Sequence, residues 1–159
     1  MNRFLRSTLL ACSFALVTGC ASGPRLRDAP PAPAPQSGPT GRVFFYRTTA
    51  FGAGLRPKIR LNGENVGRSV ARGVFYVDRP AGDYEVAVST EVTRKVTFTL
   101  APGDVKYVRF TVHFGILVGR VVPEVVDPDE AATEIGNLHL VAANVPGSGP
   151  GRVAAPSAP

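Results

Sequence analysis

Hydrophobic and polar residues alternate in short runs through the middle of the chain, from about residue 42 to residue 145. Successive side chains point to opposite faces of a β-strand, so a period of two predicts strands with one buried face. Alternating runs lie at 56–61, 84–89, 93–100 and 105–114, and further strands are predicted at 73–77 and 117–126. The run at 43–48 is instead aromatic and β-branched on both faces, which predicts a strand buried on two sides. Short strands separated by turn residues predict an all-β fold, an antiparallel β-sandwich.

Two local patterns indicate how the strands connect and which of them is central. Asn62-Gly63 supplies the positive φ angles of a type I′ hairpin turn. The longest run is predicted to be the central strand of the core, because it offers the most large apolar side chains to bury. Its inward residues are Val108, Phe110, Val112 and Phe114, and its outward residues are Tyr107, Arg109, Thr111 and His113.

One short C-terminal helix is predicted after the last of these strands. Asp127 is a helix-capping residue, Pro128 suits the first helical position, and Glu130 has the spacing to complete a capping box. Gly136 is expected to end the helix. Alternation resumes over residues 138–140 and predicts a closing strand.

The first nineteen residues have the layout of a secretory signal peptide. A basic start with Arg3 and Arg6 precedes an apolar run over residues 9–17 and a small-residue junction at Thr18-Gly19. The apolar run is much shorter than the roughly 20 residues that a membrane-spanning helix needs. Residues 1–19 are therefore interpreted as a signal that is removed from the mature protein.

Leu16-Val17-Thr18-Gly19-Cys20 resembles the lipobox of bacterial lipoproteins. The resemblance implies that Cys20 becomes the first mature residue and carries a diacylglycerol and an acylated amine, which would attach the protein to a membrane. Ala21-Ser22 follows without an aspartate, which by the same resemblance implies the outer membrane, with the protein facing the periplasm. The alternative is an ordinary cysteine after a signal peptide.

Prolines divide the remaining chain into three parts. Six of the fifteen prolines fall in residues 21–41 and four in residues 146–159. Such segments bury too little apolar surface to fold, so residues 20–41 are predicted to be a lipidated cysteine with an extended Pro/Ala-rich linker. Residues 42–145 are predicted to form one β-sandwich domain, and residues 146–159 a disordered tail.

Residue types that carry catalysis or bind metal are scarce. The two histidines, His113 and His139, are too few for a typical metal site, and the second cysteine lies in the signal peptide, so we expect no metal and no cofactor. A serine nucleophile elbow is absent from the sequence. We therefore predict a protein that is not an enzyme. A carboxylate pair stays open, and with it an uncharacterised hydrolase, among Glu85, Glu91, Asp104 and Glu124.

Two features suggest binding instead. Arg56, Lys58 and Arg60 fall on one face of a predicted strand, where they would form a basic ridge for an anionic glycan, peptidoglycan or lipopolysaccharide, or for an acidic envelope protein. The alternative is that these residues only keep the strand face soluble and have no ligand. Phe51 lies in a loop of small residues, where it could anchor a partner or fold back under the loop. Because the chain is predicted to be exported, nucleic acid is not an expected partner.

Several short motifs occur in an order that resembles a bacterial lipoprotein family of the domain-of-unknown-function type. They are Val43-Phe44-Phe45-Tyr46-Arg47, Ile59-x-Leu61-Asn62-Gly63-x-x-Val66-Gly67, Gly73-x-Phe75, Pro80-x-Gly82-x-Tyr84 and Gly103-x-x-x-Tyr107-Val108-Arg109. The hairpin and the Pro-x-Gly-x-Tyr turn also resemble the PEGA-type sandwich. The resemblance implies an immunoglobulin-like or PEGA-like fold and a lipid anchor, and it brings no catalytic residues. We predict a lipid-anchored periplasmic module with a non-catalytic binding or structural role in the envelope.

Overall fold

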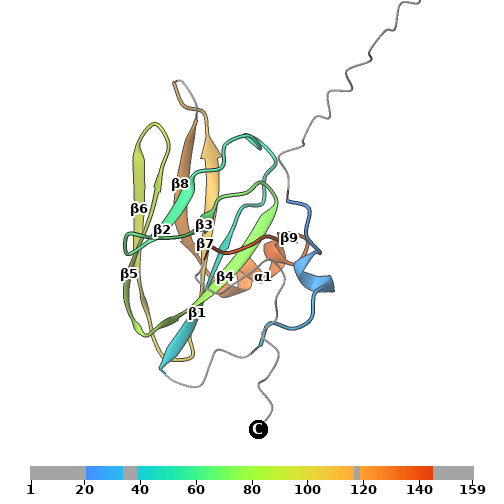
Figure 1. Ribbon diagram of the computed structural model, residues 1–159, viewed down its shortest axis with the longest axis vertical. Helices are drawn as coiled ribbons and strands as arrows, with labels where there is room; N and C mark the ends of the chain where they lie inside the picture. The colour runs from blue at the N-terminus through green and yellow to red at the C-terminus, as the bar shows by residue number, and fades with distance from the viewer. Residues whose placement is uncertain (1–20, 34–38, 117–118, 145–159) are drawn as a thin grey trace, which may run out of the picture.

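The computed structural model describes residues 21–33, 39–116 and 119–144. Its elements are η1 (Leu26–Asp28), β1 (Thr40–Tyr46), β2 (Lys58–Leu61), β3 (Glu64–Arg68), β4 (Gly73–Pro80), β5 (Gly82–Ser89), β6 (Thr93–Leu100), β7 (Val105–His113), β8 (Arg120–Val126), α1 (Pro128–Ile135) and β9 (His139–Leu140). The strands form a five-stranded sheet, β8-β7-β1-β4-β9, and a four-stranded sheet, β3-β2-β5-β6. The two sheets pack face to face (Figure 1), so the predicted all-β sandwich with one short helix is confirmed.

The pairing is not wholly antiparallel. β1 pairs in parallel with β7 and β4 pairs in parallel with β9, whereas the other neighbours are antiparallel. β1 lies between β4 and β7, which run in opposite directions, so it must be parallel to one of them. This position also makes β1, rather than the longer β7, the middle strand of its sheet.

The main core fills the space between the two sheets. Phe45 of β1 stacks on Phe75 of β4 and Phe110 of β7, with ring centroids 5.2 and 6.3 Å apart. The four-stranded sheet contributes the buried side chains Ile59, Leu61, Val66, Val86, Val88 and Leu100. These residues occupy alternate positions of their strands, as the period of two predicted.

The hairpin between β2 and β3 has the predicted turn. Asn62 and Gly63 have φ angles of 48° and 85°, the two positive values that a type I′ turn requires. The Asn62 side chain also ties the hairpin to β5, since its amide donates to the carbonyl oxygen of Asp83 at 3.1 Å and its oxygen accepts from the Glu85 amide at 2.7 Å. The turn residue therefore fixes both the hairpin and its place in the sheet.

α1 begins as predicted but is stabilised differently. Asp127 caps it by accepting from the Asp129 amide at 3.0 Å, and Pro128 is its first residue. The capping-box prediction is wrong, because the Glu130 carboxylate binds Arg109 on the sheet instead. Gly136 follows the last helical residue with a right-handed φ of −56°. Among the described residues, no helix is long and apolar enough to cross a membrane.

A second hydrophobic cluster lies between α1 and the outer face of the five-stranded sheet. Its buried members are Tyr46, Val74, Val126, Ala131, Ile135 and Leu138. Tyr107 lies on the outer face of the sheet, as predicted, where it packs against this cluster and stacks on Phe44. The alternating pattern shows which side chains share a face, but it cannot show that a helix covers that face.

The predicted extended linker is packed against the domain over the residues that the structure describes. The Ala21 amide donates to the carbonyl oxygen of Ala71 at 3.3 Å, and the Leu26 amide donates to that of Leu138 at 2.8 Å. Leu26 also packs against the second cluster, which gives this Pro-rich segment an apolar anchor. The Arg42 guanidinium donates to the Pro33 carbonyl oxygen at 2.6 Å. Residues 21–33 are therefore part of the folded unit rather than a spacer.

Candidate functional site

The predicted basic ridge is only partly formed. β2 exposes Lys58 and Arg60 and buries Ile59, as its alternation requires. Arg56 does not share that strand face, because β2 begins only at Lys58 and Arg56 belongs to the preceding loop. Its carbonyl oxygen accepts a hydrogen bond from the Arg68 guanidinium at 3.1 Å. The ridge therefore consists of Lys58 and Arg60 on the strand, with Arg56 and Arg68 at one end.

The sheet register adds two basic residues that the sequence did not reveal. Arg68 of β3 pairs with Lys58, and Lys95 of β6 lies across the small residue Ala87 from Arg60. Glu85 forms an ion pair with Lys95 at 3.0 Å. Because Lys95 is paired with Glu85, we leave it out and call Lys58, Arg60 and Arg68 the basic face. Its composition depends on cross-strand pairing between segments that are distant in sequence, so β2 alone could not predict it.

An open depression of about 500 Å³ lies on the same sheet, nearer to the β2–β3 turn. Asn62, Asp83, Glu85, Thr97 and Thr99 are among its lining residues. Asp83 accepts a hydrogen bond from the Thr99 hydroxyl at 2.6 Å. The lining also includes the stacked rings of Tyr84 and Phe98, so polar and aromatic groups share the depression.

The four carboxylates that could have formed a catalytic pair each have a different partner. Glu85 pairs with Lys95, Asp104 with Lys106, Glu124 with Arg109, and Glu91 with backbone amides of the β7–β8 connection. General acid–base catalysis by a carboxylate pair requires two of these groups to face the same substrate. In the described part of the chain, no group of three or more His, Cys, Asp or Glu residues is placed to hold a metal.

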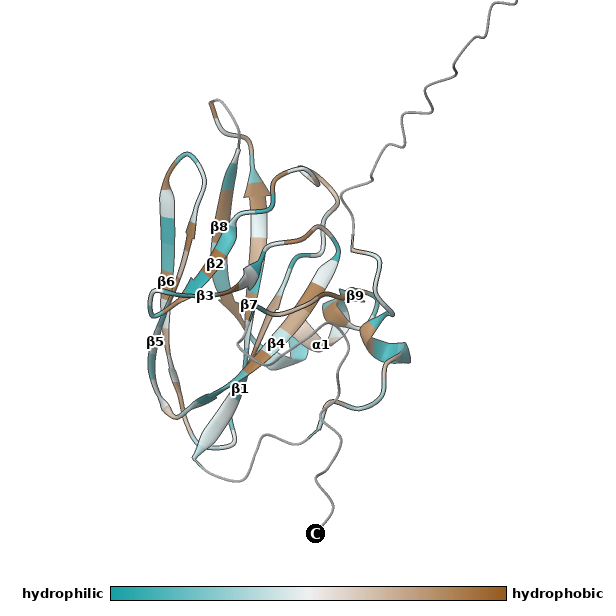
Figure 2. Cartoon of the chain, viewed as in Figure 1, coloured by the Kyte–Doolittle hydropathy of each residue, from teal (hydrophilic) through white to brown (hydrophobic). Residues whose placement is uncertain are grey.

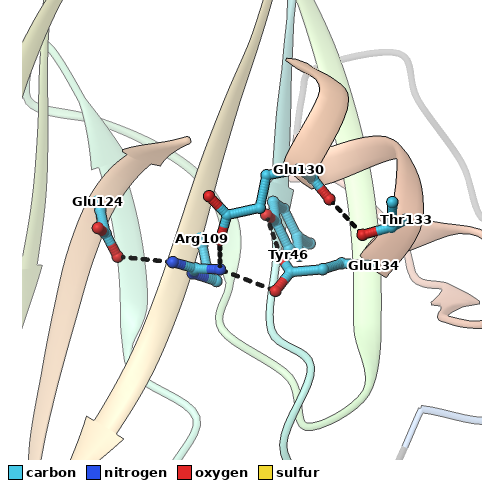
Figure 3. A network of polar contacts seen from close by, with 6 residues as sticks. All are labelled: Tyr46, Arg109, Glu124, Glu130, Thr133 and Glu134. Atoms are coloured by element: carbon cyan, nitrogen blue, oxygen red, sulfur yellow. Dashed lines mark hydrogen bonds and ion pairs between the residues drawn. The ribbon is translucent and has the colours of Figure 1, made fainter. Parts of the chain in front are cut away.

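Arg109 is the centre of a polar network beneath α1 (Figure 3). Its guanidinium contacts the carboxylates of Glu130 at 2.6 Å, Glu134 at 2.8 Å and Glu124 at 3.1 Å. Burial acts to lower the pKa of Arg109, but the hydrogen bonds that it donates to the three glutamates outweigh burial and raise the pKa above its ordinary value. The network joins β7, β8 and α1, so we interpret Arg109 as the residue that fixes the helix on the sheet.

Tyr46 belongs to the same network. Its hydroxyl donates to the second oxygen of Glu134 at 2.6 Å, and the residue is 1% exposed. Burial raises the pKa of Tyr46 well above its usual range, and the hydrogen bond to Glu134 raises it further. The protonated tyrosine therefore supports the helix.

Arg47 shapes the β1–β2 loop from inside the protein. Its side chain is fully buried, and its guanidinium donates to the carbonyl oxygens of Leu55, at 2.9 Å, and of Phe51. Charge-assisted hydrogen bonds to carbonyl oxygens are stronger than neutral ones. They hold the loop with the Phe51 side chain 48% exposed, so Phe51 does not fold back under the loop.

Phe51 belongs to a group of exposed apolar residues at the end of the sandwich where β1 and β7 finish. Its ring meets the edge of Phe114 with centroids 4.9 Å apart. Phe114 and Ile116 are each 85% exposed, and Val92 in the β5–β6 turn is 40% exposed. Phe114 was predicted to point into the core, but β7 ends one residue earlier, at His113. We call Phe51, Val92, Phe114 and Ile116 the apolar end.

Glu91 organises the β7–β8 connection behind this apolar end. The Glu91 side chain is 12% exposed. Its carboxylate accepts hydrogen bonds from the amides of Ile116 at 3.1 Å and Gly119 at 3.2 Å. A Cβ atom at Gly115 would lie 2.6 Å from the Gly119 backbone nitrogen and from both Glu91 carboxylate oxygens, so a larger residue would displace this connection. The exposed side chains therefore project from a connection whose backbone is held by hydrogen bonds.

The sequence-predicted site residues are thus divided. Lys58 and Arg60 share a strand face, Arg56 lies in the loop before it, and Phe51 belongs to the apolar end. Cys20, together with residues 1–19 and 146–159, lies outside the described residues. The exposure of Phe114 could have been suspected from Gly115 and Gly119, which flank the apolar run at 116–118, because glycine is typical of turns.

No curated protein and no solved structure matches the chain. One family model, described as "Protein of unknown function (DUF2846)", matches residues 38–121. The match covers more than half of the chain and includes β1 to β7, and therefore the basic face and the apolar end, whereas α1 lies outside it. The chain therefore belongs to the family of proteins of unknown function designated DUF2846.

Proposed function

We propose that this protein is a lipid-anchored, non-catalytic binding or structural module of the bacterial envelope, attached through Cys20 to the outer membrane and facing the periplasm. The observation that carries the proposal is a boundary: the lipobox-like segment ends at Cys20, and the next residue, Ala21, is already hydrogen-bonded to the domain. A signal peptide removed before Cys20 would leave the packed part of the chain intact. The resemblance to PEGA-type sandwiches belongs to the same proposal.

Lipidation at this position would supply enough affinity for stable attachment. Each buried methylene of an acyl chain contributes about 0.8 kcal/mol, so several chains hold a protein where one chain does not. Because residues 21–33 are packed on the domain, the anchor would hold the sandwich close to the bilayer.

The test is a Cys20→Ser variant expressed in a bacterial host with labelled fatty acid. We expect loss of acyl labelling and of membrane attachment. Cys12→Ser is the matched control, because Cys12 lies in the apolar run of the signal and should be removed with it. Attachment of Cys20→Ser after high-salt washing, or unchanged acyl labelling, would show that Cys20 is not the anchor.

A second candidate function is binding of an anionic glycan, peptidoglycan or lipopolysaccharide, through the basic face. Lys58, Arg60 and Arg68 are all exposed on adjacent strands, which is the observation that favours it. Replacing Lys58 and Arg60 with glutamine should weaken co-sedimentation with peptidoglycan or lipopolysaccharide several-fold. Added salt should weaken it as well, because it screens exposed charges.

Arg27→Gln is the matched control for this test, because Arg27 is exposed but lies on η1, away from the four-stranded sheet. Equal loss in both variants would indicate a general charge effect rather than recognition by the basic face. Crosslinking in intact cells addresses the remaining class of partner, an acidic envelope protein.

A further inference from the structure

The topology places the start of the folded chain at the same end of the sandwich as the exposed apolar residues. β1 and β7 run toward the apolar end, and β4, antiparallel to β1, starts there. Ala71 lies two residues before β4, and the Ala21 amide donates to its carbonyl oxygen. Figure 1 shows the beginning of the described chain, the β1–β2 loop and the β7–β8 connection all in the upper part of the view. Ala21, which follows Cys20 in the sequence, therefore begins the described chain at this end.

The apolar end is suited to leaving water. Figure 2 shows hydrophobic colour at the tip formed by the β7–β8 connection. Phe114 and Ile116 project there, while the Ile116 and Gly119 amides are bound by Glu91. An amide without a partner resists transfer out of water, so these internal hydrogen bonds remove one obstacle to insertion.

Basic residues surround the apolar end. They are Arg56, Arg68, Arg72 and Arg94, which are exposed, and Arg120, which is half-buried and pairs with Glu91 at 3.8 Å. The strand registers place three of them at this end, with Arg68 opposite Lys58, Arg94 opposite Val88 and Arg120 opposite His113. Arg56 and Arg72 lie in the loops just before β2 and β4, which start at this end. The opposite end carries charges of both signs in ion pairs, such as Asp104 with Lys106 and Glu64 with Arg79. This distribution would orient the domain toward an anionic lipid surface.

We propose that the apolar end docks on the lipid bilayer that holds the anchor. Phe51, Phe114 and Ile116 enter the boundary between head groups and acyl chains, and the surrounding arginines contact lipid phosphates. The sandwich then lies against the membrane with the opposite end, where β1 and β7 begin, pointing away. The position of the anchor in this proposal rests on the proposed lipidation of Cys20, whereas the insertion of the apolar end has its own test.

The first experiment uses the lipidated full chain in vesicles of phosphatidylethanolamine and phosphatidylglycerol. An environment-sensitive dye is attached to Phe114→Cys, or to Val105→Cys as the matched control. Val105 begins β7 and Phe114 follows its last residue, so the two labels report opposite ends of one strand. We expect a blue-shifted emission and quenching by brominated lipids for position 114, and neither for position 105. Equal, water-like emission at both positions on vesicle-bound protein would overturn docking.

A second experiment separates docking from lipidation. The full chain with Cys20→Ser is compared with the same chain carrying Phe114→Asp and Ile116→Asp in binding to the same vesicles. Because the rest of the chain is identical, the difference reports the apolar end. We expect a loss of about tenfold or more in the partition coefficient. Val105→Asp should leave it unchanged, and thermal unfolding should show that each variant folds.

These measurements fail in distinguishable ways. If the wild type shows no acyl labelling and does not float with vesicles, the proposed anchor is wrong. The difference in partition coefficient between the two Cys20→Ser chains would still decide docking. An unchanged partition coefficient in the Asp variant would overturn docking whether or not Cys20 is lipidated. Shielding of position 114 only in intact cells, with crosslinks to a protein and no quenching in protein-free vesicles, would assign the apolar end to a protein partner instead.

Discussion

The two sheets differ in what covers their outer faces. On the five-stranded sheet, α1 and residues 21–33 lie over Tyr46 and Tyr107, so this sheet is buried on both sides. On the four-stranded sheet, the side chains that point away from the core, such as Lys58 and Arg60, are exposed. In sequence, β1 is apolar on both faces over residues 43–46, whereas β2 alternates. The difference lies in the elements that the rest of the chain packs against them.

This difference separates two uses of charge. Arg109 on the covered face is held by three glutamates and is 19% exposed at its side chain, so its interactions serve the fold. The basic face on the open sheet points into solvent, where it is accessible to a ligand. Charged strand residues therefore suggest binding only where nothing covers the sheet.

The largest expected effect is on the free energy of unfolding when the covered face loses a buried side chain. Leu138→Ala should cost about 2 to 4 kcal/mol, because Leu138 is 5% exposed in the second cluster. Thr97→Ala on the open face should cost less than about 0.5 kcal/mol. Urea denaturation of the two variants measures both. Equal costs would mean that the outer face of the five-stranded sheet is not a true core.

Local sequence patterns predicted much of this fold. Asn62-Gly63 specifies its turn through the φ angles of its own residues, and the alternation in β2 specifies which residues it buries. Phe114 was misplaced because alternation continues past His113, where pairing with β8 ends and no strand remains to give the side chain an inner face. Strand period alone does not mark that point.

Long-range packing limited the prediction of the site. Leu26 looks like part of a proline-rich spacer until the second cluster that it contacts is known. The apolar end joins Phe51, Val92 and Phe114 from three separate connections. Its assembly depends on topology, and no single stretch of sequence contains it.

The second prediction concerns the ion pairs on the covered face. Arg109→Met should destabilise the protein by about 1 to 3 kcal/mol, because it leaves Glu124, Glu130 and Glu134 facing one another without a cation. Glu124→Gln should cost under about 1 kcal/mol, since that side chain is 58% exposed and its ion pair is screened by water. Chemical denaturation at low and high salt measures both, with the repulsion in Arg109→Met partly relieved by salt. An Arg109→Met variant as stable as Glu124→Gln would contradict the role of Arg109 in fixing α1.

The smallest effect distinguishes the covered face by its response to pH. Tyr46→Phe removes the hydrogen bond to Glu134 and should cost about 1 kcal/mol at neutral pH. The folded-state pKa of Tyr46 lies above the ordinary tyrosine value of 10.0, so its contribution is complete below pH 10.0 and is lost as the pH rises toward the folded-state pKa.

The stability difference between wild type and Tyr46→Phe should therefore shrink above pH 10.0. At that pH the hydroxyl of Tyr46 loses its proton once the wild type unfolds, which favours the unfolded state, and Tyr46→Phe has no such hydroxyl. Denaturant titrations at neutral and strongly alkaline pH measure this change. Tyr84→Phe is the control, since the Tyr84 hydroxyl donates to the Pro80 carbonyl oxygen at 2.7 Å in an exposed setting. If the two variants have the same alkaline profile, the hydroxyl of Tyr46 is accessible to water, and α1 does not seal this face of the sheet.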